Sequence, residues 1–491
     1  MKKEVRTRFA PSPTGYMHIG NLRTALYAYL FAKHSNGKFI LRIEDTDQKR
    51  YVEGATEIIY KTLQQTKLIH DEGPDKDGGY GPYVQSERKA LYKKYALELV
   101  EKGKAYYCFC SGSKEDEHGE DAEVEEVKTF GYNRHCRNLS AEEVKSNLDM
   151  GRPYVIRQKM PLEGSTTFHD EVYGDITVDN SELDDQILLK SDGMPTYNFA
   201  NVIDDHLMDI THIIRGKEYI SSTPKYQLLY EAFGWEVPKT MHLSTIMGQN
   251  ADGSVSKLSK RHGAVSFANL LEIGYLQEAI INYIALLGWS ARQEREVFSL
   301  EELTQMFDIE GIVKTNAIFD YKKLDWFNAI YINNMSHEDF VEYSKPYIQE
   351  LPKFLKEKWE FASTLAQSRI SKFTDIVPMF KFLWSYSDFS LDLFNNKKNK
   401  LDYAQSLEII KDMLLVLKET NDWSVENLNN LIQEYTNLKE YKIGKTMWPL
   451  RIGVTGETVT PGGGAEMLYL LGKEESVLRL EKVIQRLSDA I

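Results

Sequence analysis

Strand-like and helix-like segments alternate over residues 4–105. An apolar run at 39–43 precedes a helical pattern over 52–65, and an N-terminal strand-like stretch leads through a Pro/Gly turn into a helical spacing of Leu22 and Leu26. Such alternation is typical of a parallel sheet with helices on its faces. In an open sheet of this kind, ligands bind at the carboxyl ends of the strands. We therefore expect an α/β fold with a doubly wound, parallel (Rossmann-type) domain.

The pattern changes twice further along the chain. Residues 106–186 hold short strands, Gly/Pro turns, all three cysteines and an acidic run at 114–128, which together predict an α+β insertion into the sheet domain. After residue 261 helical patterns dominate, and they predict an all-α C-terminal region. Individual elements are expected at 187–190 (strand) and at 223–233, 407–417 and 476–487 (helices). The expected parts are 1–105 and 187–245 as the two halves of the sheet domain, 106–186 as the insertion, 246–329 as a connector and 330–491 as the helical region.

Composition limits the class of protein. A length of 491 residues exceeds what one hydrophobic core supports, and no apolar run approaches the roughly 20 residues of a membrane span. Residues 1–5 lead directly into a strand-like stretch without an apolar signal, and three cysteines, an odd number, argue against a disulfide framework. We therefore expect a soluble, cytoplasmic protein with no membrane association. The net charge of −13 permits RNA binding without indicating it, because phosphate contacts depend on local basic clusters.

Two distant segments are suited to bind one triphosphate. In residues 8–21 (RFAPSPTGYMHIGN), a turn and a helix start place backbone N–H groups against an anion, and His18 is able to donate to a phosphate oxygen. In residues 257–261 (KLSKR), Lys257 and Lys260 supply ammonium groups for charge that develops on a leaving pyrophosphate. Either segment alone is weak, since a His at a helix start is usually a turn residue and a basic run is usually solvated. Together they indicate adenylate formation, in which a carboxylate attacks the α-phosphate of ATP.

These two segments resemble the two signatures of class I aminoacyl-tRNA synthetases. Their flanks resemble the bacterial glutamyl-tRNA synthetases in particular, and the likeness covers roughly the first two-thirds of the chain. It departs from the general class pattern at Asn21, where a second His is common, and at Leu258 and Arg261, where Met and Ser are common. The further matching segments are 42–47 (RIEDTD), 197–206 (YNFANVIDDH), 214–219 (IRGKEY), 286–289 (LLGW) and 319–326 (FDYKKLDW), with weaker echoes at 450–456 (LRIGVTG) and 470–473 (LLGK).

The resemblance implies an ATP-dependent ligase that joins L-glutamate to tRNA(Glu) through a glutamyl adenylate and transfers it to the 2′-hydroxyl of the terminal adenosine. It makes 106–186 an acceptor-binding domain, 246–329 a stem-contact connector and 330–491 an anticodon-binding region, and it implies a monomer. A glutamyltransferase acting on a modified tRNA base would resemble only the catalytic half. A glutaminyl enzyme is a further alternative, as is a non-catalytic tRNA-binding relative, which would have damaged signatures.

The resemblance also implies a glutamate pocket. Arg8 is expected to bind the γ-carboxylate, since a guanidinium donates in a fixed fork and offers nothing to an amide N–H. Arg215 is expected beside the substrate, and Glu44, at the end of the strand 39–43, is expected to bind the substrate ammonium. The remaining pocket residues implied by resemblance are Ala10, Ser12, Tyr197 and Asn201.

For ATP, the resemblance implies contacts from Thr14, His18 and Gly20, with glycine where backbone approaches the nucleotide. Lys257 and Lys260 are expected on the phosphates, and His18, Lys257 and Lys260 form the expected catalytic set. Mg²⁺ is expected with the nucleotide, held by phosphates and water, so no protein ligand is assigned to it.

Three cysteines in one small insertion, Cys108, Cys110 and Cys136, are one ligand short of a tetrahedral zinc site. Related synthetases complete such a site with the Tyr of a Tyr-x-x-x-Cys segment, which here makes Tyr132 the expected fourth ligand and His135 its competitor. The zinc would be structural, and the alternative is three buried thiols without a metal.

Overall fold

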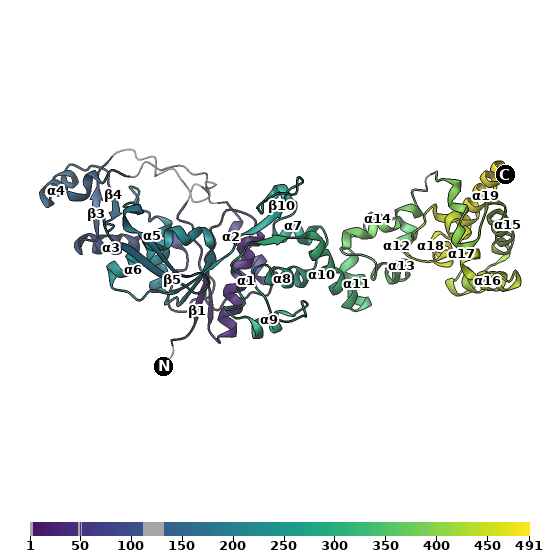
Figure 1. Cartoon of the computed structure of the whole chain (residues 1–491), viewed down its shortest axis with the longest axis horizontal. Coiled ribbons are helices and arrows are strands. Elements are labelled where there is room, and N and C mark those ends of the chain that lie inside the picture. Colours follow the sequence, from purple (N-terminus) through teal and green to yellow (C-terminus); the bar gives the residue numbers. More distant parts are fainter. Residues whose placement is uncertain (1–2, 48–49, 51, 111–131, 387) are drawn as a thin grey trace. The chain divides into compact units, whose positions relative to one another are not determined.

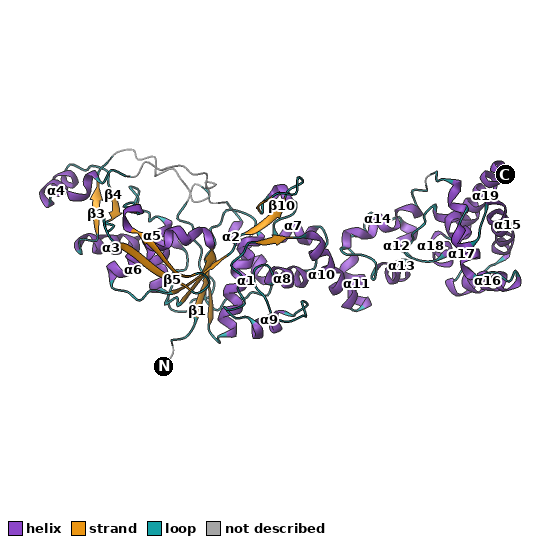
Figure 2. Cartoon of the chain, in the orientation of Figure 1, coloured by secondary structure: helices purple, strands orange, loops and turns teal. Residues whose placement is uncertain are grey.

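The computed structural model describes residues 3–47, 50, 52–110, 132–386 and 388–491, so the acidic run at 114–128 lies outside the described residues. The chain forms two compact units, one of Met1–Leu271 with Gln277–Tyr321 and one of Glu272–Leu276 with Lys322–Ile491. We call them unit 1 and unit 2. Strands are found in unit 1, whereas the described part of unit 2 is helical (Figure 2). The expected succession of an α/β part and an all-α part is confirmed, and the finer five-part division stays a prediction.

Unit 1 begins with a strand, a helix and a parallel strand. β1 (Arg6–Phe9) pairs with β2 (Lys38–Leu41), with Phe9 opposite Leu41. α1 (Ile19–His34) connects them and packs on β1, burying Leu22, Leu26 and Leu30 (Figure 1). A parallel pair needs such a crossover, because a short turn cannot return the chain to the same end of the sheet. The N-terminus of α1 therefore opens near the carboxyl end of β1.

A second sheet of unit 1 has the order β6-β5-β9-β8. β8 and β9 run parallel to one another, and β5 pairs parallel with β9 through Asp170 and Thr240. β5 and β6 form a hairpin that comes from the stretch predicted as an insertion, so part of that stretch completes this sheet. The bounds are β5 Ser165–Asp170, β6 Gly174–Asp179, β8 His212–Gly216 and β9 Lys239–Leu243.

A smaller antiparallel sheet carries the cysteines. Its order is β3-β4-β7, with β3 (Ala105–Cys108), β4 (Val155–Gln158) and β7 (Ile187–Leu189). A fourth sheet among the described residues is β11-β10-β12, with β10 (Ile246–Gln249) paired antiparallel to β11 (Val255–Lys257) and parallel to β12 (Ala317–Phe319). The other helices are α2 Ala55–Gln65, α3 Lys89–Glu101, α4 Ala141–Asp149, α5 Tyr197–Leu207, α6 Thr223–Phe233, α7 Phe267–Glu272, α8 Gln277–Ala285 and α9 Leu300–Met306.

The helix expected over 52–65 begins three residues later than predicted. Gly54 precedes it in the left-handed region at φ +81°, a conformation that an α-helix interior does not adopt. α2 therefore starts at Ala55. The helix expected over 223–233 has the predicted bounds, and Gly234 ends it at φ +77°.

Unit 2 contains α10 to α19, and the two amphipathic stretches predicted at 407–417 and 476–487 lie inside α15 and α19. α15 packs on α19. No helix among the described residues has the length and apolar character needed to cross a bilayer. The bounds are α10 Tyr321–Asn334, α11 His337–Ser344, α12 Lys353–Lys356, α13 Trp359–Ala366, α14 Ile376–Phe380, α15 Tyr403–Glu419, α16 Val425–Leu438, α17 Ile443–Thr455, α18 Gly464–Leu471 and α19 Lys473–Ala490.

Candidate active site

A cleft of about 800 Å³ lies in unit 1 and takes its walls from both predicted triphosphate-binding segments. Asn201 does not line this cleft; it lines a neighbouring cavity of about 350 Å³, to which Arg215 also contributes. The predicted residues that line the larger cleft are Arg8, Ala10, Ser12, Thr14, His18, Gly20, Glu44, Tyr197, Arg215, Lys257 and Lys260.

His18 joins the two segments. Its Nδ1 accepts a hydrogen bond from the Gly20 N–H at 3.0 Å, which caps α1 and leaves the ring proton on Nε2. The ring also hydrogen-bonds the main chain of Leu258 in the second segment. Burial lowers the pKa of His18, and the nearby Lys257 lowers it further, so the ring is neutral at pH 7. His18 thus lines the cleft as a neutral ring that is hydrogen-bonded to both segments, to Gly20 in the first and to Leu258 in the second.

Gly20 borders open space. A Cβ placed there would make only an ordinary contact, 3.4 Å from His18 Nδ1, so the fold itself does not demand glycine. A side chain would instead project into the cleft that Gly20 lines. The missing side chain therefore keeps the approach to the first turn of α1 clear for a ligand.

The second segment forms a short hairpin and turn. Lys257 ends β11 opposite Met247, and Lys260 begins a 3₁₀ turn. Its cap residue Ser259 is fixed by His262, because His262 Nδ1 accepts from the Ser259 N–H at 3.0 Å. Lys257 and Lys260 are exposed and have no ion-pair partner among the described residues. Both ammonium groups are therefore available to an anion. His262, which shapes this loop, was missed at the sequence level.

Glu44 is buried and lines the cleft, and among the described residues only one of its two carboxylate oxygens has a hydrogen-bond partner. Arg42 donates to its Oε1 from Nη2 at 2.8 Å and from Nε at 3.1 Å. Oε2 is buried and has no partner among the described residues. Burial raises the pKa of Glu44, and the attraction of Arg42 and Arg8 offsets only part of that rise. One carboxylate oxygen is thus available for a cationic ligand group.

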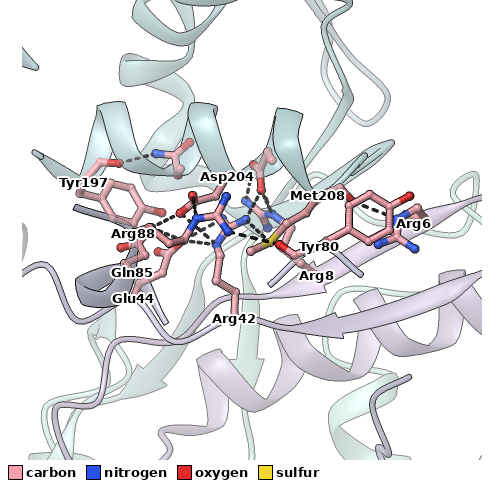
Figure 3. Close-up of polar contacts among 12 residues, drawn as sticks. Arg6, Arg8, Arg42, Glu44, Tyr80, Gln85, Arg88, Tyr197, Asp204 and Met208 are labelled. Atoms are coloured by element: carbon pink, nitrogen blue, oxygen red, sulfur yellow. Dashed lines mark hydrogen bonds and ion pairs between the residues drawn. The ribbon is translucent and has the colours of Figure 1, made fainter. Parts of the chain in front are cut away.

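Arg42 is fully buried and connects Glu44 to two aspartates of α5, Asp204 and Asp205. Its Nη1 donates to Asp205 Oδ1 at 2.7 Å, and Asp205 in turn accepts from Arg8 Nε at 3.1 Å. Figure 3 shows Arg42 between Glu44 on one side and Arg8 on the other. Burial alone would raise the pKa of Asp205, but Arg8 and Arg42 outweigh it and hold that pKa below its usual range.

Asp204, the neighbour of Asp205, anchors the other side of this network. It accepts from Arg88 Nε at 2.7 Å, from Gln85 Nε2 at 2.9 Å and from the Tyr92 hydroxyl at 2.8 Å. Asp204 and Asp205 lie in the matching segment 197–206, but the sequence alone predicted no role for them. They could have been found because they are charged residues of a mostly apolar helix. Buried charged side chains are stable only when they are paired.

Arg8 and Arg215 differ in how their charge is matched. Arg8 uses Asp205 and the Ile214 carbonyl. Arg215 donates from Nε to His242 Nε2 at 3.2 Å and from Nη2 to Thr223 Oγ1 at 3.2 Å, and its Nη1 is buried without a partner among the described residues. The hydrogen bonds of Arg215 to His242 and Thr223 do not neutralise its positive charge, because neither partner is a carboxylate.

The three cysteines cluster as predicted. Their Sγ atoms all lie within 4.8 Å of one another, with Cys110 and Cys136 3.5 Å apart. The Tyr132 hydroxyl lies 3.2 Å from Cys108 Sγ and 4.0 Å from Cys110 Sγ, whereas His135 is exposed and is not part of the cluster. Sulfur ligands of a tetrahedral zinc lie about 3.8 Å apart. Three thiols and a phenol oxygen thus fit the donor set of a zinc ion.

The chain resembles known proteins over its whole length. Residues 4–326 match the family model for the catalytic domain of class I tRNA synthetases (E and Q), and residues 339–484 match a model described as an anticodon binding domain. The glutamate–tRNA ligase of Clostridium novyi is 53% identical over 494 residues, covering 100% of this chain and 99% of that protein. The glutamate–tRNA ligase of Lachnoclostridium phytofermentans is 52% identical and covers 99% and 100%.

A solved structure agrees. The crystal structure of a glutamate tRNA ligase from Elizabethkingia meningosepticum, in complex with its amino acid, is 37% identical with a TM-score of 0.85, and the match covers 99% of this chain and 100% of that chain. One family model matches within each unit for the most part, and the relatives and this structure match the chain over both units. The chain therefore belongs to the class I aminoacyl-tRNA synthetases and, among them, to the glutamate–tRNA ligases.

Proposed function

We propose that the cleft of unit 1 binds L-glutamate between Glu44 and the two arginines Arg8 and Arg215, and ATP against residues 14–20 and 257–260. The chain is an ATP-dependent ligase that attaches glutamate to tRNA(Glu). The observation that carries the site assignment is the pair of unsatisfied buried groups, Glu44 Oε2 and Arg215 Nη1, in one cleft. Such groups cost free energy unless a ligand pairs with them.

The charges of this pocket match glutamate. Arg8, Arg42 and Arg88 are bonded to buried carboxylates, whereas the hydrogen-bond partners of Arg215 among the described residues are His242 and Thr223. Free glutamate, with two carboxylates and one ammonium, carries a net charge opposite to that of Arg215. Glutamine carries none and would leave the charge of Arg215 without a carboxylate, which supports selection of the acid over the amide.

The first step is a displacement at phosphorus. An oxygen of the glutamate α-carboxylate attacks the α-phosphorus of ATP, the bond to the bridging oxygen of the β-phosphate breaks, and pyrophosphate leaves. Lys257 and Lys260 stabilise the charge that moves onto the leaving group, and His18 exchanges its hydrogen bond to the Leu258 main chain for one to the phosphates. Mg²⁺ would reduce the charge of the nucleotide while held by phosphates and water. The 2′-hydroxyl of the tRNA then attacks the adenylate carbonyl and releases AMP.

Unit 2 supports the choice of acceptor. Its anticodon binding domain model spans residues 339–484, so the partner is a whole tRNA. We further propose that the chain acts as a monomer in the cytoplasm, where ATP and tRNA are supplied. Size-exclusion chromatography with light scattering tests the first of these statements.

We also propose that Cys108, Cys110, Cys136 and Tyr132 hold a structural zinc ion. Arg157 lies with its guanidinium carbon 3.9 Å from the centroid of the Tyr132 ring, where it would offset the negative charge of a thiolate ligand set. The zinc would fix β3 to the turn at Cys136 and has no role in either chemical step.

Pyrophosphate exchange tests the assignment. With tRNA(Glu) present, glutamate should support exchange and glutamine should not. Exchange with glutamine alone would identify a glutaminyl enzyme. Exchange with neither amino acid would support the non-catalytic reading, and glutamate exchange without transfer to tRNA would support a glutamyltransferase.

A further inference from the structure

Three neighbouring strands bring one histidine between an aspartate and Arg215. Arg215 on β8 is the direct Cα partner of His242 on β9, and Asp170 on β5 is the partner of Thr240, two residues before His242. Residues paired across strands, and residues two apart along a strand, share a face of the sheet. The order β5-β9-β8 therefore places Asp170, His242 and Arg215 in a row on that face.

The hydrogen bonds of this row have one possible polarity. Asp170 Oδ2 lies 2.7 Å from His242 Nδ1, and this carboxylate accepts, so Nδ1 carries the proton. Arg215 Nε, 3.2 Å from His242 Nε2, is able only to donate, so Nε2 offers its lone pair. The single proton of the Thr223 hydroxyl goes to the Tyr219 carbonyl at 2.8 Å, which leaves Thr223 Oγ1 to accept from Arg215 Nη2. His242 is thus a neutral imidazole.

We propose that His242 is a positioning residue for glutamate binding: as the neutral Nδ1–H tautomer fixed by Asp170, it orients the Arg215 guanidinium without neutralising its charge. A carboxylate in place of His242 would hold the guanidinium as well but would compete with the substrate for its charge. By contrast, Arg8 and Arg42 form ion pairs with a carboxylate, which neutralises their positive charge. This inference rests on the proposed contact of Arg215 with glutamate.

Asp170 is itself committed to this task. Its Oδ1 accepts from the backbone N–H groups of Val172 and Tyr173 at 3.0 and 2.9 Å. In addition to the ring Nδ1–H, its Oδ2 accepts from the backbone N–H of His242 at 3.1 Å. Neither Asp170 nor His242 has exposed surface. The β5–β6 hairpin, part of the predicted insertion, therefore reaches the glutamate pocket through this carboxylate.

Protonation of His242 should weaken glutamate binding. The charged groups that face the ring are Asp170 from β5, Arg215 from β8 and Glu218 from the turn after β8. Burial lowers the pKa of His242, and Arg215 adds to this, while Asp170 and Glu218 oppose it. The ring therefore stays neutral at pH 7. Below its lowered pKa, an Nε2–H would face the Nε–H of Arg215, and both the lost hydrogen bond and the like charge would disturb the guanidinium.

The test compares His242→Ala with His242→Gln in aminoacylation of tRNA(Glu). Loss of a hydrogen bond to a charged group should raise the KM for glutamate about tenfold or more in His242→Ala, with the KM for ATP unchanged. His242→Gln retains an acceptor and cannot titrate, so it should stay near wild type at pH 7 and lose the wild-type rise of the glutamate KM at acid pH. His212→Gln, on β8 but outside the cleft, is the matched control and should change neither KM.

Equal rises of the glutamate and ATP KM values in His242→Ala would indicate a merely structural role and overturn the inference, as would an unchanged glutamate KM. Should His242→Ala fail to fold, the pH profile of His242→Gln decides: a wild-type profile would refute the inference. Arg215→Ala separates this from the proposed function. If Arg215→Ala leaves the glutamate KM unchanged, the assignment of Arg215 is wrong; if it raises that KM and His242→Ala does not, only the positioning role fails.

Discussion

Arg42 binds one oxygen of the Glu44 carboxylate at 2.8 Å and leaves the other oxygen buried and unpaired among the described residues. Burial raises the pKa of this carboxyl group, and the guanidinium beside it opposes that rise. The site is therefore arranged before glutamate arrives, and the ammonium of the substrate completes it. Arg42, which touches no expected ligand, fixes the position of Glu44 and favours its charged form.

Replacing Arg42 should cost both stability and substrate affinity. Arg42→Ala leaves Glu44 and Asp205 buried without their shared partner, which should lower the free energy of unfolding by about 3–5 kcal/mol. The KM for glutamate should rise more than the KM for ATP, because Glu44 loses its orientation. Urea unfolding and aminoacylation kinetics measure the two effects. Arg292→Ala, which removes an exposed pair with Asp308, should cost at most about 1 kcal/mol. A similar loss in both variants would contradict the role given to Arg42.

Acid should destabilise unit 1 through its paired carboxylates. Burial would raise the pKa of Glu72, but its two-point pair with Arg6, at 2.7 and 2.8 Å, holds that pKa below its usual range. A carboxyl group whose pKa is lower in the folded state adds stability above its unfolded pKa, near 4.3, and loses it as the pH falls through the folded value. The free energy of unfolding should therefore fall as the pH drops below about 5.

Glu72→Gln tests that statement without touching the cleft, which Glu72 does not line. At pH 7 the variant should lose about 1–3 kcal/mol of stability, and its stability should depend less on pH below 5 than that of the wild type. The KM values for glutamate and ATP should stay unchanged. An acid dependence as steep as that of the wild type would show that other groups dominate.

The sequence revealed what depends on local pattern. Amphipathic spacing located α6, α15 and α19, and the turn and helix start at His18 located the first ATP-binding segment. The pairing of Arg42 with Asp205 spans 163 positions and leaves no local signal, because any buried acid could serve as the partner. The same holds for Asp170, which reaches His242 only because β5 joins the sheet beside β9. A charged residue in a buried segment indicates that it has an ion-pair or hydrogen-bond partner, but only the fold shows which residue that partner is.

The neighbouring cavity is a second limit of sequence reasoning. Asn201 was expected with Tyr197 in one pocket, and its Nδ2 does donate to the Tyr197 carbonyl at 2.9 Å. That bond is an ordinary contact of one helical turn, and Asn201 lines the smaller cavity together with Arg215. Residues one turn apart share a helix face, yet Tyr197 lines the larger cleft and Asn201 the smaller cavity, and Arg215 lines both.

Removal of one thiol should abolish zinc binding. Cys108→Ser should lower the zinc content of the purified protein from about one equivalent to near none, because three remaining donors hold the ion poorly. The melting temperature should fall, while glutamate-dependent pyrophosphate exchange per folded molecule should change little, since no step uses the metal. His135→Ala is the matched control and should retain zinc. Wild-type protein without zinc would refute the proposed site, and loss of zinc in His135→Ala would reassign the fourth ligand.

Lys260 should act on the transition state more than on substrate binding. Its ammonium is exposed at the start of the 3₁₀ turn, without an ion-pair partner among the described residues, so it is free to follow charge onto the leaving pyrophosphate. Lys260→Ala should lower kcat for glutamate activation by about 10²–10³-fold and change the glutamate KM little. Arg261→Ala removes a neighbouring cation that donates to Ser256 Oγ at 2.7 Å, and it should lower kcat far less. Pyrophosphate exchange in the presence of tRNA(Glu) measures both variants. If Lys260→Ala weakens ATP binding and leaves kcat unchanged, its role is uniform binding of the nucleotide, because an interaction made only in the transition state lowers kcat itself.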